Sequence, residues 1–220
     1  CLHLCSYILK TYLDEMQYSL IAFDVDGVLL KQKSSWGIIH DYFGVSNGDS
    51  LNAFLKGLIS YQEFVDRDVA LWIRKKGTIR KSEIEKIAQN VEPNPNFQEL
   101  ASFLAEFRGK KIAISGGVDA IVSRVSSFFP IEEIYSNELV FREGKLVGGR
   151  AVVDPQNKGK ILDRFKGFKV SIGDSEWDID MFRKSDYSIL FNSEHDVDGV
   201  DLVIKGNDLG KLAKVLREII

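Results

Sequence analysis

Short apolar runs alternate with amphipathic stretches along most of the chain. The run at residues 18–23 has the length and composition of a strand that is buried on both faces of a parallel sheet. From residue 96 onward, amphipathic periodicity predicts helices at residues 97–107, 118–129, 158–165, 179–183 and 209–220. Between them, apolar runs predict strands at residues 111–115, 134–140, 169–172, 187–191 and 202–204. This alternation predicts an α/β fold around a parallel sheet.

Residues 34–94 follow a different pattern, because helical periodicity continues there without a convincing strand. Apolar side chains at helical spacing predict helices near residues 36–43, 51–58 and 61–72. A fourth helix is predicted to begin at Ser82, since Ser82-Glu83-Ile84-Glu85 matches a capping box. Pro93 and Pro95 then interrupt the chain, as expected at a domain boundary. We therefore expect residues 34–94 to form an all-helical insertion.

The remaining parts of the chain are predicted to form one core and one appendage. Residues 16–33 and 95–220 would make up the α/β core, in which Leu139 to Val147 reads as a hairpin turning at Glu143-Gly144. Met16 directly precedes the first strand, so residues 1–15 are expected to be an N-terminal appendage whose role the sequence does not reveal.

Composition narrows the class of protein. The chain has 220 residues, 45% of them hydrophobic and 28% charged, with a net charge of −3, which is ordinary for a globular protein. A slight negative charge provides no general attraction for nucleic acid or anionic membrane. Cys1 and Cys5 are the only cysteines, so no disulfide framework or zinc site is implied. No run approaches the ~18 apolar residues of a membrane span. We expect a cytoplasmic protein that is a monomer or homodimer.

Two carboxylates at the end of the first predicted strand suggest a site. Asp24 and Asp26 lie in Asp-Val-Asp-Gly-Val, directly after the apolar run. Ligands of open α/β sheets gather at the carboxyl ends of the strands, so both side chains would face a crevice. The same pentapeptide recurs at Asp196 to Val200, where it follows polar residues and is expected to be a surface loop. The Asp-x-Asp spacing alone does not identify a site, so the assignment of Asp24 and Asp26 depends on other polar residues that would lie near them.

Later strand ends carry groups that suit phosphate and a divalent cation. The strand at residues 111–115 ends in Ser115-Gly116-Gly117 before a predicted helix start, a place that anions favour. The strand at residues 169–172 is followed by Asp174, with Asp178 one helical turn on. Carboxylate oxygens suit Mg²⁺. Lys158 or Lys160 could balance the negative charge. Each feature alone also has a structural reading: a tight turn, helix-capping acids or a solvated lysine.

The order of these parts resembles the haloacid dehalogenase superfamily over about residues 17–220. All four motifs of the superfamily occur in sequence, at Asp24-x-Asp26, Ser115, Lys158 and Gly173-Asp174. The helical insertion after the first motif, Ser115-Gly-Gly and the hairpin look most like the phosphoserine phosphatase-like branch. The resemblance implies a Rossmann-like three-layer core with a small all-helical cap, and an Mg²⁺-dependent phosphatase that hydrolyses a small phosphate monoester through an aspartyl-phosphate.

The resemblance also implies a role for each motif residue. Asp24 would be the nucleophile and Asp26 the general acid and base. Mg²⁺ would be held by Asp24, the backbone carbonyl of Asp26 and Asp174, with Asp178 supporting the site. The remaining roles would be phosphoryl binding by Ser115 and the Gly116 amide, and charge neutralisation by Lys158.

The substrate-binding positions depart from the branch pattern. Phosphoserine phosphatases place an acid shortly after the first motif and an Arg in the cap, which read the amino and carboxyl groups of the substrate. Here Leu30 to Ser34 contains no acid, and Asp68 occupies the cap position, next to Arg67. We therefore expect an enzyme that is not specific for phosphoserine. Lys33 and Arg67, together with Lys31, suggest a more anionic phosphorylated metabolite.

Two other functions remain open at the level of sequence. A phosphotransferase could pass the phosphoryl group from the same intermediate to an alcohol. A phospho-accepting, receiver-like signalling module also uses acids, a hydroxyl residue and a lysine around Mg²⁺. Asp26 and the helical insertion argue against the module, because a protein that only holds phosphate needs no acid or base beside its nucleophile.

Overall fold

The computed structural model describes residues 19–220, so the predicted appendage at residues 1–15 lies outside the described residues. Its centre is a seven-stranded sheet with the strand order β4-β3-β2-β1-β5-β6-β7. The strands are β1 (Leu20–Phe23), β2 (Lys110–Val118), β3 (Glu133–Arg142), β4 (Lys145–Arg150), β5 (Lys169–Gly173), β6 (Tyr187–Phe191) and β7 (Leu202–Ile204). All neighbouring pairs are parallel except the β3–β4 hairpin at one edge. This confirms the predicted α/β class and the hairpin.

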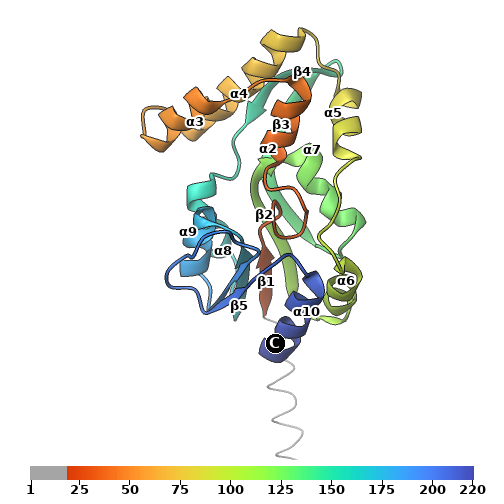
Figure 1. The fold of residues 1–220 in the computed structure, drawn as a ribbon, viewed down its shortest axis with the longest axis vertical. Coiled ribbons are helices and arrows are strands. Elements are labelled where there is room, and N and C mark those ends of the chain that lie inside the picture. The colour runs from red at the N-terminus through yellow and green to blue at the C-terminus, as the bar shows by residue number, and fades with distance from the viewer. Residues whose placement is uncertain (1–18) are drawn as a thin grey trace, which may run out of the picture.

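Helices cover both faces of the sheet, and the alternation of side chains in β1 shows how. Leu20 and Ala22 point to one face, where they pack with residues of α8 (Gly159–Leu162) and α9 (Ile179–Arg183). Ile21 and Phe23 point to the other face and join the larger cluster that contains α6 (Phe97–Glu106) and α10 (Leu209–Ile219). The two pairs of helices lie on opposite sides of the sheet (Figure 1). Because all four β1 side chains are buried, the strand is apolar throughout, as predicted for the centre of a parallel sheet.

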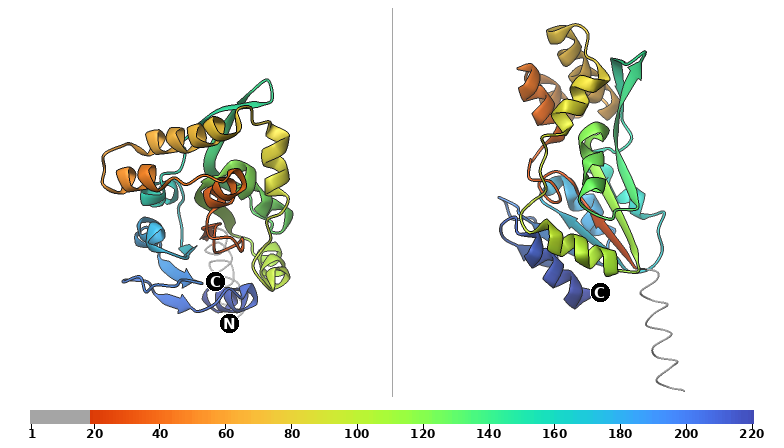
Figure 2. Two further views of the ribbon diagram at one scale, coloured as in Figure 1. Left: turned by 45° about the horizontal axis from the view of Figure 1, so that its top comes forward. Right: turned by 90° about the vertical axis from the view of Figure 1, so that its right-hand side faces the viewer.

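Residues 34–94 contain helices and no strand. The four helices are α2 (Ser35–Phe43), α3 (Gly48–Leu55), α4 (Tyr61–Lys76) and α5 (Lys81–Ala88), hereafter the cap helices. With the β3–β4 hairpin they occupy the end of the molecule opposite α10 (Figure 1, Figure 2). The hairpin packs closely on α4, since a side chain at Gly149 would meet Val65. None of the helices in residues 19–220 combines the length and apolar character needed to cross a membrane.

The predicted start of the fourth cap helix was wrong. The helix α5 begins at Lys81, and its N-cap is Arg80 without a side-chain cap hydrogen bond, so Ser82 lies inside the helix. The cause is tertiary: the Lys81 amide donates to the Gly144 carbonyl at 2.9 Å, and Arg80 pairs with Lys145 in an isolated bridge. The tip of the hairpin therefore sets the first turn of α5, and the local capping signal at Ser82 does not.

Some predicted helices are shorter than their patterns. The stretch 118–129 forms α7 (Asp119–Val122) and then a 3₁₀ helix at Ser123–Ser127, where serines and valines favour an α-helix less than straight-chain residues do. The stretch 158–165 forms only α8 as α-helix. The helix predicted at residues 51–58 ends at Leu55, before Gly57 with its left-handed φ of 67°.

The second copy of the pentapeptide lies in a loop between β6 and β7, as predicted. The side chain of Asp196 is 88% exposed and lies 3.7 Å from Lys205 Nζ. No ion pair or hydrogen bond between residues 19–220 connects it to Asp24 or Asp174. The predicted surface loop for the second copy is therefore confirmed.

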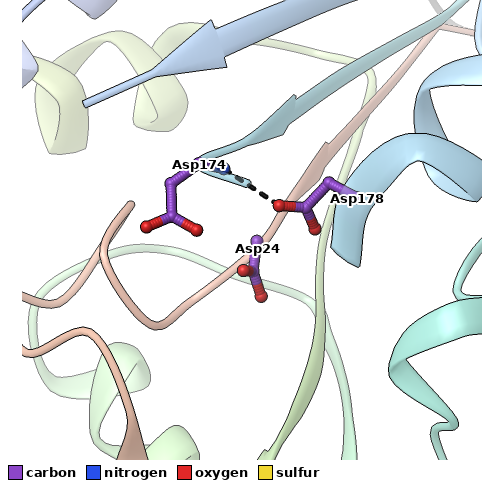
Figure 3. A group of neighbouring side chains, drawn as sticks. All are labelled: Asp24, Asp174 and Asp178. Carbon is purple, nitrogen blue, oxygen red and sulfur yellow. Dashed lines mark hydrogen bonds between the residues drawn. The ribbon is translucent and has the colours of Figure 1, made fainter. Parts of the chain in front are cut away.

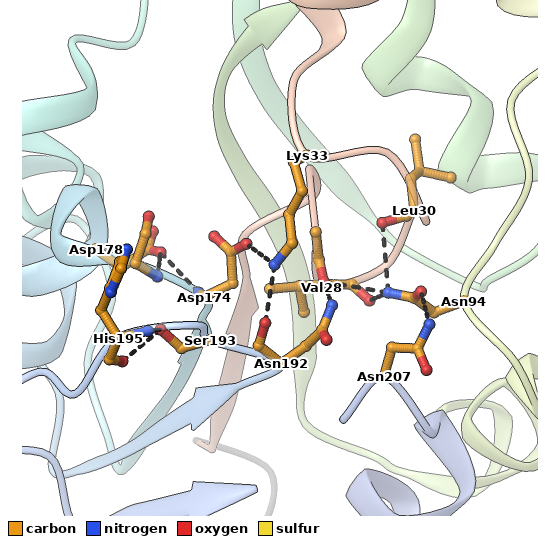
Figure 4. Close-up of polar contacts among 12 residues, drawn as sticks. Val28, Leu30, Lys33, Asn94, Asp174, Asp178, Asn192, Ser193, His195 and Asn207 are labelled. Atoms are coloured by element: carbon orange, nitrogen blue, oxygen red, sulfur yellow. Dashed lines mark hydrogen bonds and ion pairs between the residues drawn. The ribbon is translucent and has the colours of Figure 1, made fainter. Parts of the chain in front are cut away.

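A buried asparagine connects the end of the helical segment to the loop after β1. The Nδ2 group of Asn94 donates to the carbonyls of Gly27, Val28 and Leu30 at 3.1, 2.7 and 3.4 Å (Figure 4). Its Oδ1 accepts from Asn207 Nδ2 at 3.2 Å. Because the side chain is fully buried, these carbonyls have no access to water from that side.

We expect Asn94→Ala to lower the free energy of unfolding by about 1–3 kcal/mol, because it removes the side-chain donor of the Val28 and Leu30 carbonyls. Urea unfolding followed by circular dichroism would measure the loss. Asn90→Ala is the matched control in the same segment, since the Asn90 side chain is exposed and its Nδ2 group donates to Lys86 O at 3.2 Å. Equal stability of the two variants would contradict a stabilising role for Asn94.

Candidate active site

The register of three parallel strands brings the predicted site residues together. Phe23, the last residue of β1, pairs with Ala113 of β2 and with Ile172 of β5. Asp24 follows directly, and Ser115 and Asp174 each follow two residues after the paired positions. All three side chains therefore lie at the carboxyl ends of the central strands, where ligands of such sheets are bound.

Three carboxylates lie close together at this edge of the sheet. Asp24, Asp174 and Asp178 have oxygen atoms within 4.8 Å of one another, and the three side chains lie beside one another (Figure 3). Glycines permit this approach: a side chain on Gly27 would collide with Asp174 Oδ2, and one on Gly173 would collide with the carboxyl group of Asp178. Close packing of acids in a buried place needs a compensating charge.

Lys158 supplies part of that charge. Its Nζ lies 2.9 Å from Asp24 Oδ1 and 2.7 Å from Asp178 Oδ1, and the side chain is buried. Burial alone would lower the pKa of Lys158, but the Asp178 and Asp24 carboxylates outweigh it and raise the pKa, so the ammonium group stays charged. Lys160, the other lysine considered, is exposed.

Asp178 positions both the loop that contains Asp174 and the side chain of Lys158. Its Oδ2 accepts hydrogen bonds from the backbone amides of Asp174 and Ser175 at 2.9 and 3.3 Å, while its Oδ1 binds Lys158. Both oxygens are thus committed to protein donors. The geometry agrees with the supporting position expected from the sequence.

The surroundings of Asp24 disfavour its charged form despite the nearby ammonium group of Lys158. Burial raises its pKa well above the usual value, and the carboxylates of Asp178 and Asp174 raise it further, while Lys158 acts in the opposite direction. Burial also raises the pKa of Asp174, against the effect of a hydrogen bond from Lys33. A bound cation would relieve this repulsion.

Asp26 lies beside the cluster in a different environment. Its Oδ2 accepts a hydrogen bond from the Ser35 amide at 2.7 Å, and its Oδ1 has no hydrogen-bond partner among residues 19–220 although it is buried. Burial raises the pKa of Asp26 to about 6, against the Ser35 hydrogen bond, which lowers it. A carboxyl group with a pKa near neutrality and one free oxygen can both donate and accept a proton.

Ser115 and Gly116 lie in an irregular part of β2. The strand continues to Val118 with a register shift between Ile114 and Val118, and Val118 is also the N-cap of α7, so the predicted helix begins one residue later than expected, at Asp119. The buried Ser115 Oγ accepts from the Gly117 amide at 3.0 Å. The sequence did place a hydroxyl and two glycines correctly beside Asp26, since a side chain on Gly117 would meet Asp26 Oδ2 at 3.0 Å.

The Gly116 carbonyl accepts three side-chain hydrogen bonds that were not predicted from the sequence. It accepts from Trp36 Nε1, Tyr61 OH and Asn137 Nδ2 at 2.9, 3.1 and 2.7 Å. Trp36 and Tyr61 come from the cap helices α2 and α4. Nothing in the sequence connects these three distant positions. Through Trp36 and Tyr61, the cap helices are held against the irregular part of β2.

Lys33 reaches the acidic cluster, whereas Arg67 does not. Lys33 Nζ lies 2.8 Å from Asp174 Oδ2 and donates to the Asn192 carbonyl at 2.8 Å (Figure 4). Arg67 donates to Glu63 one helical turn away and is absent from the residues that line the cavity of the site. Lys31, 3.6 Å from Glu92, also lies outside that cavity. Of the cations expected to contact substrate, only Lys33 has a position suited to it.

The donor set fits a hard divalent cation. Asp24 and Asp174 each use one carboxylate oxygen in an ion pair with a lysine, at 2.9 and 2.8 Å, which leaves the second oxygen for a cation. All candidate ligands are oxygen atoms, as Mg²⁺ and Ca²⁺ prefer, and the described residues include no cysteine or histidine in the cluster. The acidic cluster could therefore hold such a cation.

A cavity of about 310 Å³ opens above these residues. Its floor contains Asp24, Asp26, Ser115, Lys158 and Asp174. Its opposite wall comes from α2, α3 and α4 and includes Trp36, His40, Asn47, Leu51, Phe54, Tyr61 and Phe64. A polar, charged floor beneath a largely apolar wall is typical of a small-molecule site.

Comparison with known proteins agrees with this geometry. The chain is 26% identical over 216 residues to the phosphoserine phosphatase of Methanocaldococcus jannaschii, a match that covers 92% of this chain and 100% of that protein. A solved structure of a phospho-aspartyl intermediate analogue of phosphoserine phosphatase has a TM-score of 0.72 at 22% identity and covers 89% of this chain and 97% of its own.

A second solved structure is also similar to this chain. A HAD family hydrolase from Salmonella enterica has a TM-score of 0.76 at 16% identity, covering 92% of this chain and 73% of its own, and therefore shares the fold. No protein-family model matches the sequence. The fold, the order of the motifs and these relatives lead to one conclusion: the chain is a phosphoric monoester hydrolase that is similar to the phosphoserine phosphatases and shares the fold of the haloacid dehalogenase hydrolases.

Proposed function

We propose that the protein hydrolyses a small phosphate monoester with Mg²⁺, through an aspartyl-phosphate on Asp24. The observation that carries this proposal is the pairing of two unlike carboxyl groups. Asp24 is held by Lys158 at 2.9 Å in the acidic cluster, whereas Asp26 has a free oxygen and a pKa raised to about 6 by burial. Two carboxyl groups in such different environments are suited to different roles, Asp24 as the nucleophile and Asp26 as the general acid.

In the first step, a carboxylate oxygen of Asp24 attacks phosphorus and forms an acyl phosphate. The bond from phosphorus to the ester oxygen breaks, and its electron pair stays on the departing oxygen. Asp26 donates its proton to that oxygen, so the leaving group departs as a neutral alcohol. The raised pKa of Asp26 supports this role, because a substantial fraction of the group is protonated near pH 6.

In the second step, Asp26 accepts a proton from water, and the resulting oxygen nucleophile attacks phosphorus. The bond between phosphorus and the Asp24 oxygen breaks, which releases inorganic phosphate and restores both carboxyl groups. A phosphotransferase would use the same step with an alcohol in place of water. Measuring phosphorylated product with an added acceptor alcohol would distinguish the two outcomes.

The other residues of the floor would bind and neutralise the phosphoryl group. Ser115 Oγ and the Gly116 amide would donate to its oxygens, and Lys158 would balance its charge. Mg²⁺ bound by Asp24, the Asp26 carbonyl and Asp174 would supply further positive charge for the transferring group. Asp178 would hold Lys158 in place, as its 2.7 Å hydrogen bond indicates.

We expect Asp26→Asn to separate the two carboxyl roles. For an alkyl phosphate, kcat/KM should fall by about 10²–10⁴-fold, because the poor leaving group then departs without a proton. For 4-nitrophenyl phosphate the fall should be much smaller, because nitrophenolate needs no proton to leave. Steady-state release of phosphate with Mg²⁺ would measure both values.

Asp24→Asn serves as the control for that experiment, since loss of the nucleophile should affect both esters equally. If Asp26→Asn slowed the two esters by the same factor, Asp26 would not be the acid in the first step. The result would leave the phosphatase assignment itself intact.

We further propose that the enzyme is not specific for phosphoserine. The loop from Leu30 to Ser34 offers no acid to pair with an ammonium group. Asp68, at the cap position where the branch has its Arg, is fully buried and accepts from Ser50 Oγ at 2.7 Å and Asn47 Nδ2 at 2.8 Å. A small phosphorylated metabolite without amino-acid groups fits this site better, whether the protein is a monomer or a homodimer.

A further inference from the structure

The wall of the cavity opposite the acidic cluster is largely apolar. Five of its side chains are apolar or aromatic and come from three different helices: Trp36 from α2, Leu51 and Phe54 from α3, and Tyr61 and Phe64 from α4. Phe54 and Phe64 stack with ring centroids 5.4 Å apart. We call the cavity-lining side chains of α2, α3 and α4, with Asn47 at the start of α3, the cap wall.

The polar atoms of two aromatic residues in the cap wall are already occupied. Trp36 Nε1 donates to the Gly116 carbonyl at 2.9 Å. Tyr61 OH donates to the same carbonyl at 3.1 Å and accepts from Asn137 Nδ2 at 2.8 Å. A tryptophan has one donor and a tyrosine one O–H, so neither has a proton left to offer a ligand.

The hydrogen bonds of His40 require its neutral form. Trp72 Nε1 can only donate, so His40 Nδ1 accepts from it at 2.8 Å. The proton is therefore on Nε2, which lies 3.1 Å from Asp68 Oδ2. Both ring nitrogens are used inside the cap, and the imidazole carries no charge toward the cavity. Asn47 uses one of the two N–H groups of its amide on the same carboxylate, at 2.8 Å.

The charges that line the cavity all lie on the floor side. They belong to Asp24, Asp26, Asp174, Lys158 and Lys33. Lys33 pairs with Asp174 at 2.8 Å, and none of the described cap-wall residues is charged. A charged group on the alcohol side of a substrate would lose water without gaining a partner, which is costly.

We propose that the natural substrate is a small monoester of an uncharged, apolar alcohol, with an aromatic ring favoured. This inference rests on the proposed phosphatase function and names the class of its substrate. The phosphate would occupy the charged floor, and the ring would pack against Phe54 and Phe64 in an offset or edge arrangement. A cavity of about 310 Å³ restricts the ester to a small molecule. The expectation of a more anionic ester is thereby replaced, because two of its three cations lie outside the cavity.

A panel of alkyl phosphates with unactivated leaving groups tests the proposal. With Mg²⁺, kcat/KM for benzyl phosphate should exceed the values for phosphoethanolamine, phosphoserine and phosphoglycolate by roughly tenfold or more, since only these three bring a charge to the cap wall. Along ethyl, propyl and butyl phosphate, kcat/KM should rise by about fourfold for each methylene group.

A pair of variants on one helix tests the location. Leu51→Lys places a cation in the cap wall, and it should lower kcat/KM for benzyl phosphate about tenfold and reduce the preference for it over phosphoglycolate. Leu55→Lys makes the same change one turn further along α3, where the side chain is 52% exposed and outside the cavity lining. This control should leave the preference unchanged, and thermal unfolding would verify that both variants fold.

The outcomes separate the two proposals. Hydrolysis of the charged esters at rates equal to or above those of benzyl phosphate, with activity lost in Asp24→Asn, would overturn the substrate class and leave the phosphatase function standing. An unchanged preference in folded Leu51→Lys would also overturn it. No hydrolysis of any ester would contradict the phosphatase function itself.

Discussion

Asp24→Asn is expected to abolish turnover, with kcat/KM for every monoester reduced by at least about 10³-fold. An amide oxygen is a far weaker nucleophile than a carboxylate, so the acyl phosphate does not form. The change is close to isosteric. It also removes one negative charge from a group of three carboxylates whose oxygens lie within 4.8 Å. Phosphate release with Mg²⁺ over a panel of esters measures the effect, and thermal unfolding verifies that the protein remains folded.

The duplicated pentapeptide provides a matched control within the same chain. Asp196→Asn changes the same residue in the same five-letter context, but at a side chain that is 88% exposed. Its turnover should stay within about twofold of wild type, because exposed substitutions distant from a site have small effects. Comparable losses in the two variants, or undiminished turnover in Asp24→Asn, would contradict the role of Asp24.

The central sheet and the floor of the site were predictable because their causes are local in sequence. A strand buried on both faces must be apolar, which marks the run ending at Phe23 and the run ending at Ile172. Parallel strands then bring the residues after each run to one edge, so Asp24 and Asp174 meet without knowledge of any distance. Their meeting is observed, whereas their chemical roles remain proposals.

The cap wall was not predictable, because its character depends on partners far along the chain. In the sequence, Tyr61 looks like one of the apolar positions of an amphipathic helix. In the fold, its hydroxyl donates to the Gly116 carbonyl and accepts from Asn137 Nδ2, 55 and 76 positions away. Asp68 was interpreted as a departure from a substrate-binding Arg, while in the fold it satisfies donors from within the cap. Residue types indicated which groups could carry charge, but only tertiary contacts determine which groups remain free for a ligand.

Lys158→Met is expected to remove activity and also to destabilise the protein. The buried ammonium group joins Asp24 and Asp178 at 2.9 and 2.7 Å, so its removal leaves two buried carboxylates without their shared cation. Removing one partner of a buried ion pair costs about 3–5 kcal/mol of unfolding free energy, because the remaining charge is uncompensated. Methionine keeps most of the side-chain volume, so the loss reports on charge more than on packing.

Urea unfolding of Lys158→Met and Lys160→Met measures this effect against a control two residues away. Lys160 is exposed, so its substitution should change the free energy of unfolding by less than about 0.5 kcal/mol and leave turnover near wild type. Adding Asp24→Asn to Lys158→Met should restore part of the lost stability, because it removes one of the uncompensated charges. Equal stability of the two lysine variants would mean that Lys158 does not balance the buried acids. An inactive but fully stable Lys158→Met would limit its role to binding the phosphoryl group.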